Sequence, residues 1–285
     1  MTGNPRVTPA LQVVFAAVIF GSSGAFIRYL SLPPATISFF RMAVPALVLL
    51  IYFGVTGSFV ILKASRLILL ASFLNGIRIL LYYMGYTYTT IGNAVVVLYT
   101  WPVFAGILSI LFLKEKITRM KMVTLGLAFS GIVLVYSGSE FSFGSDDFLG
   151  ITAMILSAAI YASTVIIFKF TSGKYTALET TLFQNLLGAL MFLPAFVAIR
   201  PFPSAGQFTV AIAYAALVGL FGFTLFFTAL RRIPASTASH LTYMEVPSAV
   251  CFGFFLFGEE VTVQMIAGGL MILISVILMR RHSRV

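Results

Sequence analysis

Charged residues are scarce in this chain: only 9% of its 285 residues are Asp, Glu, Lys or Arg, and only 8 residues are acidic. A water-soluble domain carries about 25% charged residues, so this composition excludes an ordinary soluble domain. The sequence is instead 60% hydrophobic and contains 29 Phe residues. A lipid bilayer suits such a composition, and each helix that spans a bilayer needs about 20 mainly apolar residues.

Cysteine and the common catalytic motifs are also missing or nearly so. The single cysteine, Cys251, excludes an intramolecular disulfide, and we interpret it as a small apolar helix residue. The sequence has no H-E-x-x-H, no G-x-S-x-G and no P-loop, which are patterns of zinc, serine and nucleotide chemistry. We therefore expect no enzyme, no cofactor, no metal site and no ATPase domain.

Ten apolar stretches follow one another along the chain, separated by short breaks rich in Gly, Pro, Ser or charge. They predict helices at about 10–30, 35–54, 65–85, 91–113, 120–137, 148–169, 176–197, 208–229, 235–257 and 262–279. The first stretch is longer than a signal-peptide core of about 7–15 residues, so we expect a retained helix there. The predicted fold class is an all-α integral membrane protein with ten transmembrane helices.

The Lys and Arg residues alternate with these spans. If both termini are cytoplasmic, fourteen of the 18 Lys and Arg residues lie in cytoplasmic segments, only Arg28 and Arg200 lie outside, and Arg41 and Arg78 lie within spans. Cytoplasmic loops carry an excess of Lys and Arg, so we predict a multi-pass protein of the inner (plasma) membrane with both termini inside. The basic residues form no single patch, so the net charge of +10 does not indicate a nucleic-acid partner.

One part of the sequence occurs twice in altered form, because residues 91–118 return as residues 233–262. Three identities recur at an offset of 144 positions, namely Ala94 with Ala238, Glu115 with Glu259, and Thr118 with Thr262. We predict two copies of one unit, residues 1–140 and residues 145–285. Each copy holds five spans, an odd number, so the second copy must cross the membrane upside down. Such inverted repeats are typical of secondary transporters, which bind substrate between the repeats.

Several motifs carry a resemblance to a known family. They are FGSSGAFIRYL, FFRMAVPALVLL, Gly92-Asn93-Ala94 followed by WPVF and LKEK, and LRRIPASTA followed by MEVP and GEE. Over nearly its whole length the chain resembles the ten-helix EamA-like branch of the drug/metabolite transporter (DMT) superfamily. The resemblance implies alternating access, a central cavity lined by spans 1–4 and 6–9, and peripheral spans 5 and 10. Many members export amino acids or related metabolites, and the chain is similar to bacterial exporters that accept aromatic amino acids.

Four ionisable side chains lie within predicted spans: Arg41, Arg78, His240 and Glu245. Such groups cost about 2.5–3.5 kcal/mol each on insertion scales and usually face protein or water. Arg78 and Glu245 lie at similar depths, about 19 Å and 15 Å from the cytoplasmic side at 1.5 Å per residue. We expect Arg78 to bind a substrate carboxylate and Glu245 to bind an ammonium group or carry a proton. A structural ion pair between the two is the alternative.

A polar stripe on the third predicted span comprises Asn75, Arg78, Tyr82 and Tyr86, at helical spacings of three and four. The second copy lacks this stripe, because Gly222 stands where Arg78 is expected, so we interpret the stripe as an adaptation to substrate. We expect Tyr82 in the cavity. For Tyr86 near the outer end, a place in the interfacial aromatic belt is the favoured interpretation.

The fourth and ninth spans contribute the other candidates. Tyr99 and Trp101 are two residues apart, about 200° around a regular helix, so we expect one of them to face the cavity and the other to pack. The prolines Pro102 and Pro247 are candidate hinges. We favour a hydrogen-bonding role in helix packing for His240, which lies five residues from Glu245, a spacing unsuited to a metal site.

Three features complete the candidate site. Arg41 lies near the outer edge of its span, where it either extends its charge outward or contacts substrate. Gln184 lies in the equivalent region of the seventh span and is expected to line the cavity opposite Arg41. The run of small residues from Gly21 to Ala25 is expected to allow a close helix approach.

These observations predict a secondary transporter that moves small amphiphilic metabolites, with amino acids as the favoured substrates, outward by alternating access. Its expected partners are a small-molecule substrate and the lipid bilayer. Two other functions stay open: an importer or exchanger of a nucleoside- or S-adenosyl-type metabolite, and a lipid or lipid-head-group flippase. The sequence also leaves open proton coupling and the choice between a monomer and a homodimer.

Overall fold

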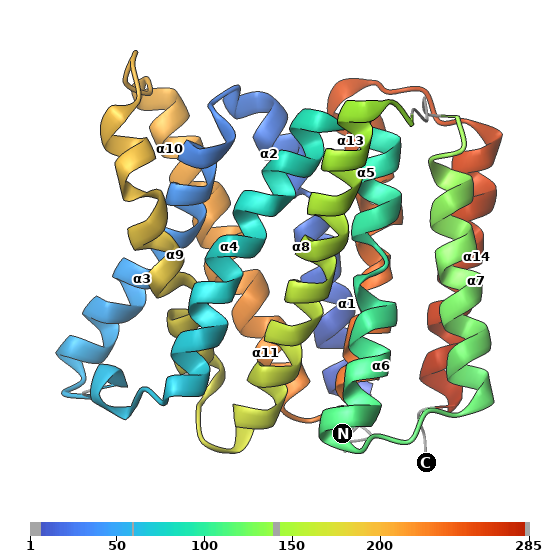
Figure 1. The fold of residues 1–285 in the computed structure, drawn as a ribbon, viewed down its shortest axis with the longest axis horizontal. Helices are drawn as coiled ribbons and strands as arrows, with labels where there is room; N and C mark the ends of the chain where they lie inside the picture. The colour runs from blue at the N-terminus through green and yellow to red at the C-terminus, as the bar shows by residue number, and fades with distance from the viewer. Residues whose placement is uncertain (1–6, 59, 139–142, 283–285) are drawn as a thin grey trace.

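The computed structural model describes residues 7–58, 60–138 and 143–282, and every regular element in these ranges is a helix (Figure 1). In chain order the longer helices are α1 (Val7–Gly21), α2 (Ser23–Leu30), α3 (Pro34–Val55), α4 (Arg66–Tyr88), α5 (Ile91–Leu98), α6 (Trp101–Leu113), α7 (Arg119–Val135), α8 (Ser145–Phe170), α9 (Ala177–Ala198), α10 (Ala205–Tyr214), the π-helix η3 (Ala215–Gly222), α11 (Phe223–Leu230), α12 (Ala235–Leu241), α13 (Glu245–Phe257) and α14 (Val263–His282). Short 3-10 turns form η1 (Val60–Lys63), η2 (Thr171–Gly173) and η4 (Thr242–Met244).

Eight of the described helical stretches are long and apolar enough to cross a membrane, and Val263–Met279 forms a shorter apolar helix. The eight are Pro9–Leu30, Pro34–Val55, Arg66–Tyr88, Asn93–Leu113, Asp146–Gly173, Ala177–Ala198, Ala205–Leu230 and Ala235–Phe257. They agree with predicted spans to within a few residues, and α7 occupies the position of the span predicted at 120–137. The predicted all-α membrane fold is therefore confirmed.

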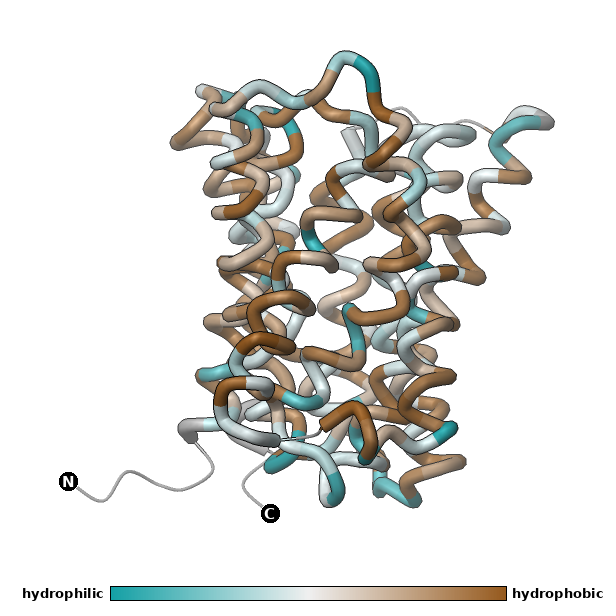
Figure 2. The backbone as a smooth tube through the Cα atoms, turned by 90° about the vertical axis from the view of Figure 1, so that its left-hand side faces the viewer, coloured by the Kyte–Doolittle hydropathy of each residue, from teal (hydrophilic) through white to brown (hydrophobic). Residues whose placement is uncertain are grey.

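The helices stand side by side and run between two ends of the molecule, called here the upper and the lower end as drawn in Figure 1. α1 begins and α14 ends at the lower end. Large apolar side chains are exposed on the sides, with Leu111 65% and Phe255 78% exposed. Figure 2 shows hydrophobic segments along most of the height of the bundle, with much of the hydrophilic chain near the two ends. This surface matches the hydrocarbon core of a bilayer.

The contacts between helices follow a regular scheme. α3 packs against α9, α4 packs against α8, and α6 packs against α8 and α12. On the other side of the bundle α1 packs against α11, α13 and α12. The hydrophobic core that these contacts create runs through both halves of the chain.

α7 and α14 form a separate pair at one side of the bundle (Figure 1). Glycines allow their close approach, because a Cβ atom on Gly131 would lie 2.7 Å from the carbonyl oxygen of Gly268, and a Cβ on Gly268 would meet the carbonyl oxygen of Gly131 in turn. Small residues at such a crossing let two backbones touch inside a membrane, where no hydrophobic effect drives helices together.

Candidate functional site

Several helices are interrupted at the centre of the molecule. α1 gives way to α2 at Ser22, α5 to α6 at Thr100, and α12 to α13 through η4 at Thr242. At each break a hydroxyl group donates a hydrogen bond to the carbonyl oxygen three residues earlier, over 2.6–2.7 Å. Inside a membrane, irregular backbone is tolerated only where it is buried in protein or lines a water-filled space. The three breaks therefore mark the expected wall of a cavity.

A cavity of about 120 Å³ lies between these broken helices. It has room for several waters or one small solute, since a single water needs about 10–15 Å³. Aromatic side chains make up half of its lining residues: Phe20, Tyr82, Tyr83, Tyr99, Trp101, Tyr161, Tyr214 and Phe223. Three ionisable side chains, Arg41, Arg78 and Glu245, share the cavity with them. The site thus combines apolar walls with a few charges of both signs.

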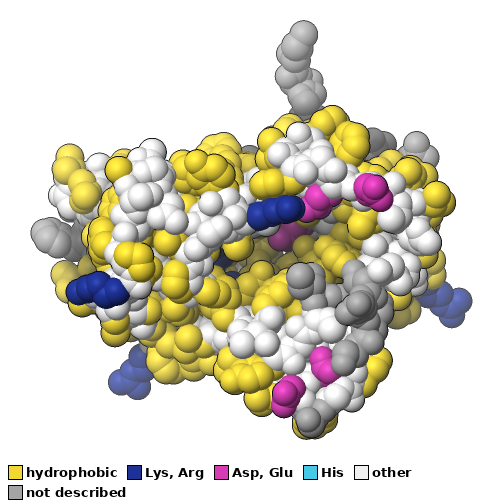
Figure 3. All heavy atoms as spheres, turned by 90° about the horizontal axis from the view of Figure 1, so that it is seen from above, with side chains coloured by type: hydrophobic (Ala, Val, Ile, Leu, Met, Phe, Trp, Pro, Cys, Tyr) yellow, Lys and Arg dark blue, Asp and Glu magenta, His cyan; other side chains and the backbone are white. Residues whose placement is uncertain are grey.

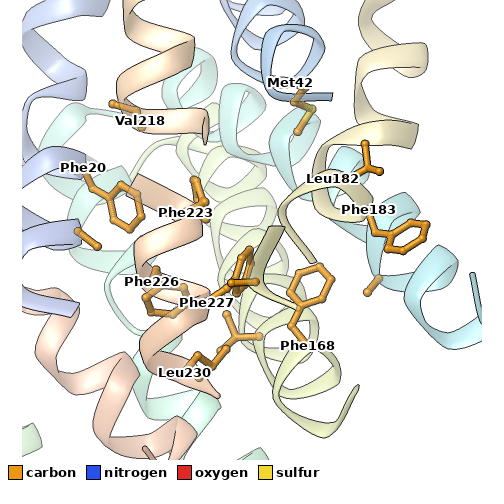
Figure 4. Close-up of a cluster of buried hydrophobic side chains, with 14 of the residues drawn as sticks. Phe20, Met42, Phe168, Leu182, Phe183, Val218, Phe223, Phe226, Phe227 and Leu230 are labelled. Atoms are coloured by element: carbon orange, nitrogen blue, oxygen red, sulfur yellow. The ribbon is translucent and has the colours of Figure 1, made fainter. Parts of the chain in front are cut away.

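The surroundings of this cavity include a hollow of the upper end and a cluster of aromatic rings. Figure 3 looks down on the upper end and shows it hollowed near its centre. Buried aromatic rings lie between α1, α8 and α11, as Figure 4 shows for Phe20, Phe168 and Phe227. Phe20 of α1 lies 4.7 Å from Phe223, and Phe168 of α8 lies 5.1 Å from Phe227, measured between ring centroids. Phe20 and Phe223 also line the cavity, so this cluster of rings packs against the cavity wall.

Arg78 is held in place on two sides. Its Nε donates a hydrogen bond to Oδ1 of Asn75 over 3.2 Å, and the Asn75 amide donates in turn to the backbone oxygen of Gln184. The Arg78 guanidinium carbon lies 4.5 Å from the ring centroid of Tyr161, a cation–π contact. Asn75 and Gln184 therefore stand behind Arg78 and are not part of the cavity wall that the structure describes.

Arg41 faces the cavity from α3 with spare hydrogen-bonding capacity. Its guanidinium carbon lies 5.0 Å from the ring centroid of Phe223. Among the described residues, its buried Nη1 atom has no hydrogen-bond partner. A buried donor without a partner costs about 1–3 kcal/mol, and more when charged. A bound carboxylate would remove this penalty. The Arg41 side chain points inward to the cavity, so the structure does not support the alternative in which it extends outward.

Glu245 is the first residue of α13, where the positive end of the helix dipole favours a carboxylate. The Tyr99 side chain lines the same cavity as this carboxylate. The two ion pairs found in the described ranges are Arg28–Glu259 and Lys63–Glu179. Arg78 and Glu245 therefore line one cavity without forming a direct ion pair.

The expectation that only one of Tyr99 and Trp101 faces the cavity is wrong. Both side chains line it, because α5 ends at Leu98 and α6 begins at Trp101, so the residues between them do not follow one regular helix. The Trp101 ring also contacts Tyr161, with 4.4 Å between ring centroids. The break therefore brings two neighbouring aromatic residues to the same wall.

Other sequence candidates lie outside the cavity. His240 is fully buried, and its Nε2 atom lies 3.3 Å from the Ser275 hydroxyl. The Tyr86 ring contacts the Tyr82 ring at 4.8 Å rather than the cavity wall. Pro102 and Pro247 each fall in the first turn after a helix break, where a proline removes no helical hydrogen bond.

The sequence interpretation missed part of the cavity wall. Tyr161, Tyr214, Phe20 and Phe223 all line it, but each lies in an apolar run that looks like ordinary helix packing. The small residues did signal a close contact, since a Cβ atom on Gly21 would lie 2.8 Å from the Glu245 carbonyl oxygen. Gly21 thus lets α1 reach the helix that carries Glu245.

A helical membrane bundle with a central cavity of apolar walls and few charges, set among broken helices, defines a membrane transporter. The chain belongs to the EamA-like transporter family, whose sequence model matches residues 8–137 and again residues 148–281. This family is part of the DMT superfamily, so the expected family is confirmed. The protein is accordingly a multi-pass protein of the inner (plasma) membrane.

Similar proteins agree with this assignment. An uncharacterized transporter of Archaeoglobus fulgidus is 25% identical over 95% of both chains. The pseudopaline exporter CntI of Pseudomonas aeruginosa is 21% identical over 96% of both chains. An S-adenosylmethionine uptake transporter of Rickettsia conorii is 26% identical over 78% of this chain and 74% of the other. A crystal structure with 14% identity superposes with a TM-score of 0.81 over 98% of both chains, which supports the fold alone.

Proposed function

We propose that the protein is a secondary transporter that moves small amphiphilic metabolites outward across the inner membrane by alternating access. The favoured substrates are amino acids, those with aromatic side chains first among them. The observation that carries the proposal is the unpartnered Nη1 atom of Arg41 in a cavity that also holds Arg78, Glu245 and aromatic walls.

The proposal includes ten spans in two inverted five-helix repeats, 1–140 and 145–285. The helix contacts support it. If each helix is replaced by its counterpart in the other half, the α4–α8 contact becomes the α11–α1 contact. The α3–α9 and α7–α14 contacts each join two counterparts and therefore stay the same. The family model also matches the chain twice. At the centre, the Tyr243 hydroxyl donates a hydrogen bond to the backbone oxygen of Tyr99, 144 positions earlier.

We further propose that the lower end faces the cytoplasm. The basic residues of the described lower loops, such as Lys63, Lys114, Lys174 and Arg231, support this orientation. In that orientation we infer a state in which the aromatic cluster closes the cavity toward the cytoplasm, and the hollow of the upper end, seen in Figure 3, supports an opening toward the outside. A substrate exported from the cell would leave from this state.

Substrate recognition follows from the charges of the cavity. A substrate carboxylate would bind the free edge of Arg41, assisted by Arg78, because a guanidinium group binds carboxylates through paired hydrogen bonds. Glu245 would bind the substrate ammonium group or, in its absence, a proton. The Tyr and Trp rings offer faces against which an apolar or aromatic side chain can stack.

An S-adenosyl metabolite is the second candidate substrate. It also combines an amino-acid group with a flat ring, and a relative named as an S-adenosylmethionine uptake transporter supports it. Transport in the inward direction would then replace export. The aromatic wall formed by Tyr161 and Trp101 suits a purine as well as a phenyl ring.

Counterflow in proteoliposomes tests the function. Vesicles that contain the purified protein are loaded with an unlabelled amino acid, nucleoside or S-adenosylmethionine, and saturable uptake of the labelled compound is measured with and without a pH gradient. We expect counterflow of aromatic amino acids and an increase of about 10- to 100-fold in the half-saturation concentration for Arg41→Gln. Arg200→Gln, at the upper end and outside the cavity wall, is the matched control.

The same assay separates the alternatives. Loss of the pH-gradient effect in Glu245→Gln with retained counterflow assigns the proton to Glu245. Translocation of labelled lipid in vesicles without solute assigns a flippase instead. Absence of saturable counterflow across the whole panel, with a folded protein, contradicts the proposed function.

A further inference from the structure

A second hollow, of about 670 Å³, opens between α6 and α7 in the lower half of the molecule. Its walls are apolar along the two helices, where Val103, Ile107 and Ile110 face Met122 and Leu125. Polar groups gather at its lower end and back wall: Glu115, Lys116, Lys121, Ser236 and His240. The hollow is therefore a groove with an apolar length and a polar end.

The groove faces the surroundings of the bundle and not the central cavity. Ile107 is 50% exposed, Ile110 48% and Met122 58%. α7 packs along α14 and, among the described residues, makes no other extensive helix contact, which leaves the space beside α6 unfilled. Gly106 contributes to this space, since a Cβ atom there would meet only Ile117, at 3.6 Å. In a bilayer, hydrocarbon chains fill such a groove.

The polar end of the groove carries two cations without a direct ion pair among the described residues, and the Glu115 carboxylate attracts Lys121 at longer range. In the part of the chain that the structure describes, no carboxylate lies within 4.0 Å of the ammonium group of Lys116 or Lys121. The Lys121 ammonium donates one hydrogen bond, to the Ser236 hydroxyl over 3.2 Å. The nearby Glu115 carboxylate is occupied by the backbone amides of Ala235 and Ser236. Two ammonium groups at the lower end of the groove attract a phosphate group.

A third polar group points to a ligand independently of the charges. His240 lines the groove, is fully buried, and its Nδ1 atom has no hydrogen-bond partner among the described residues. A buried imidazole nitrogen without a partner is unfavourable unless another group or water reaches it. A polar ligand or its water shell at the end of the groove would supply that partner.

We propose that this groove binds an anionic phospholipid of the cytoplasmic leaflet, with an acyl chain between α6 and α7 and its phosphate at Lys116 and Lys121. The site lies outside the transport cavity and depends only on the proposed cytoplasmic placement of the lower end. Lys121 also bonds Ser236, the residue that Glu115 holds at the start of α12. A phosphate bound at Lys121 would therefore lie beside the contact between Glu115 and Ser236, and anionic lipid is expected to change the rate of transport.

Native mass spectrometry of the purified full-length protein tests the site. The protein is delipidated in mild detergent and titrated with phosphatidylglycerol or with zwitterionic phosphatidylethanolamine of identical chains. We expect phosphatidylglycerol to bind about tenfold more tightly, and Lys116→Gln/Lys121→Gln to remove this preference while leaving phosphatidylethanolamine binding unchanged. Lys114→Gln/Lys174→Gln, which removes the same charge from exposed positions outside the groove, is expected to retain it.

A second variant tests the chain-binding part of the groove. Gly106→Leu places a side chain in the apolar length and is expected to weaken the binding of both lipids, with Gly126→Leu, where a Cβ atom meets nothing within 4 Å, as control. Equal affinity of the wild type for the two lipids, or an unchanged preference in the double Lys variant, overturns the proposal. These measurements need no transport, so a failure of the lipid site and a failure of the proposed function are distinguishable.

Discussion

Glu115 and Glu259 occupy equivalent positions in the two copies of the repeated segment, but they have different partners. The Glu115 carboxylate accepts hydrogen bonds from the backbone amides of Ala235 and Ser236 at the start of α12, over 2.6 and 3.1 Å, and from the Ser236 hydroxyl. The Glu259 carboxylate pairs with Arg28 at the upper end, where both side chains are more than half exposed. Glu115 thus caps a helix of the other half of the chain, whereas Glu259 forms an exposed ion pair.

The two helix starts explain why the difference exists. α12 follows Pro234, whose side chain cannot cap a helix, so Glu115 supplies the missing acceptor from the other half of the chain. The equivalent helix α5 has its own cap, because the Thr90 hydroxyl accepts a hydrogen bond from the Asn93 amide. In the proposed exchange between states, Glu115 would release α12 and Glu259 would approach the start of α5.

The largest expected effect comes from removing the Glu115 cap. Glu115→Ala leaves two backbone amides and one hydroxyl without their charged acceptor, and a hydrogen bond to a charged group contributes about 1.5–3 kcal/mol. We expect the melting temperature in detergent to fall and the lower end to open. Opening is measured as faster labelling of Ser236→Cys by a membrane-impermeant thiol reagent applied at the lower end, in a Cys251→Ser background. Unchanged labelling would show that Glu115 does not close this end.

The next largest effect on stability is expected at the contact between α7 and α14. Gly268→Ala places a Cβ atom within about 2.9 Å of the backbone of Val135 and against Gly131, and such overpacking costs about 1–3 kcal/mol. The adjacent Gly269→Ala meets nothing within 4 Å and serves as the control. We expect only the first change to lower the melting temperature. Equal melting temperatures for both variants would contradict the described approach of the two helices.

The contact at which the two copies meet is expected to have a smaller effect. Tyr243→Phe removes the hydroxyl that donates to the Tyr99 backbone oxygen over 3.0 Å, and loss of one buried hydrogen bond costs about 1 kcal/mol. We expect a lower melting temperature together with an altered rate of counterflow, because this contact joins two helix breaks beside the cavity. Tyr175→Phe removes two hydrogen bonds of similar length outside the cavity wall, one to the Lys63 backbone oxygen and one from the Ser65 amide, and is expected to change stability alone.

Much of the fold could be predicted because a bilayer leaves few choices. Every backbone group must bond within the protein, so an apolar run between polar breaks becomes a helix, and the ends of Pro34–Val55 and Ala235–Phe257 followed from the sequence. The membership of Arg78, Tyr82 and Glu245 in one cavity also followed, because polar groups are rare within spans.

The remaining features depend on tertiary contacts that leave no trace in the local sequence. Tyr99 and Trp101 share a wall because of a break at Thr100, which is stabilised by a single hydroxyl bond. Tyr161 contributes its ring face to Arg78 only after α8 packs beside α4. Arg78 bonds Asn75 on its own helix instead of Glu245, and no spacing in the sequence distinguishes these two arrangements.

The smallest expected effect comes from changing Glu259, the counterpart of Glu115 at the upper end. Glu259→Gln weakens an exposed ion pair with Arg28, and such pairs contribute about 0–1 kcal/mol. We expect almost no change in melting temperature and no increase in the labelling of Ser236→Cys, in contrast to Glu115→Ala. If Glu259 caps α5 in the opposite state, the variant should nevertheless slow the return step, so that counterflow falls while stability stays constant. If Glu259→Gln matches the wild type in both stability and counterflow, then only Glu115, at the lower end, contributes to the exchange between states.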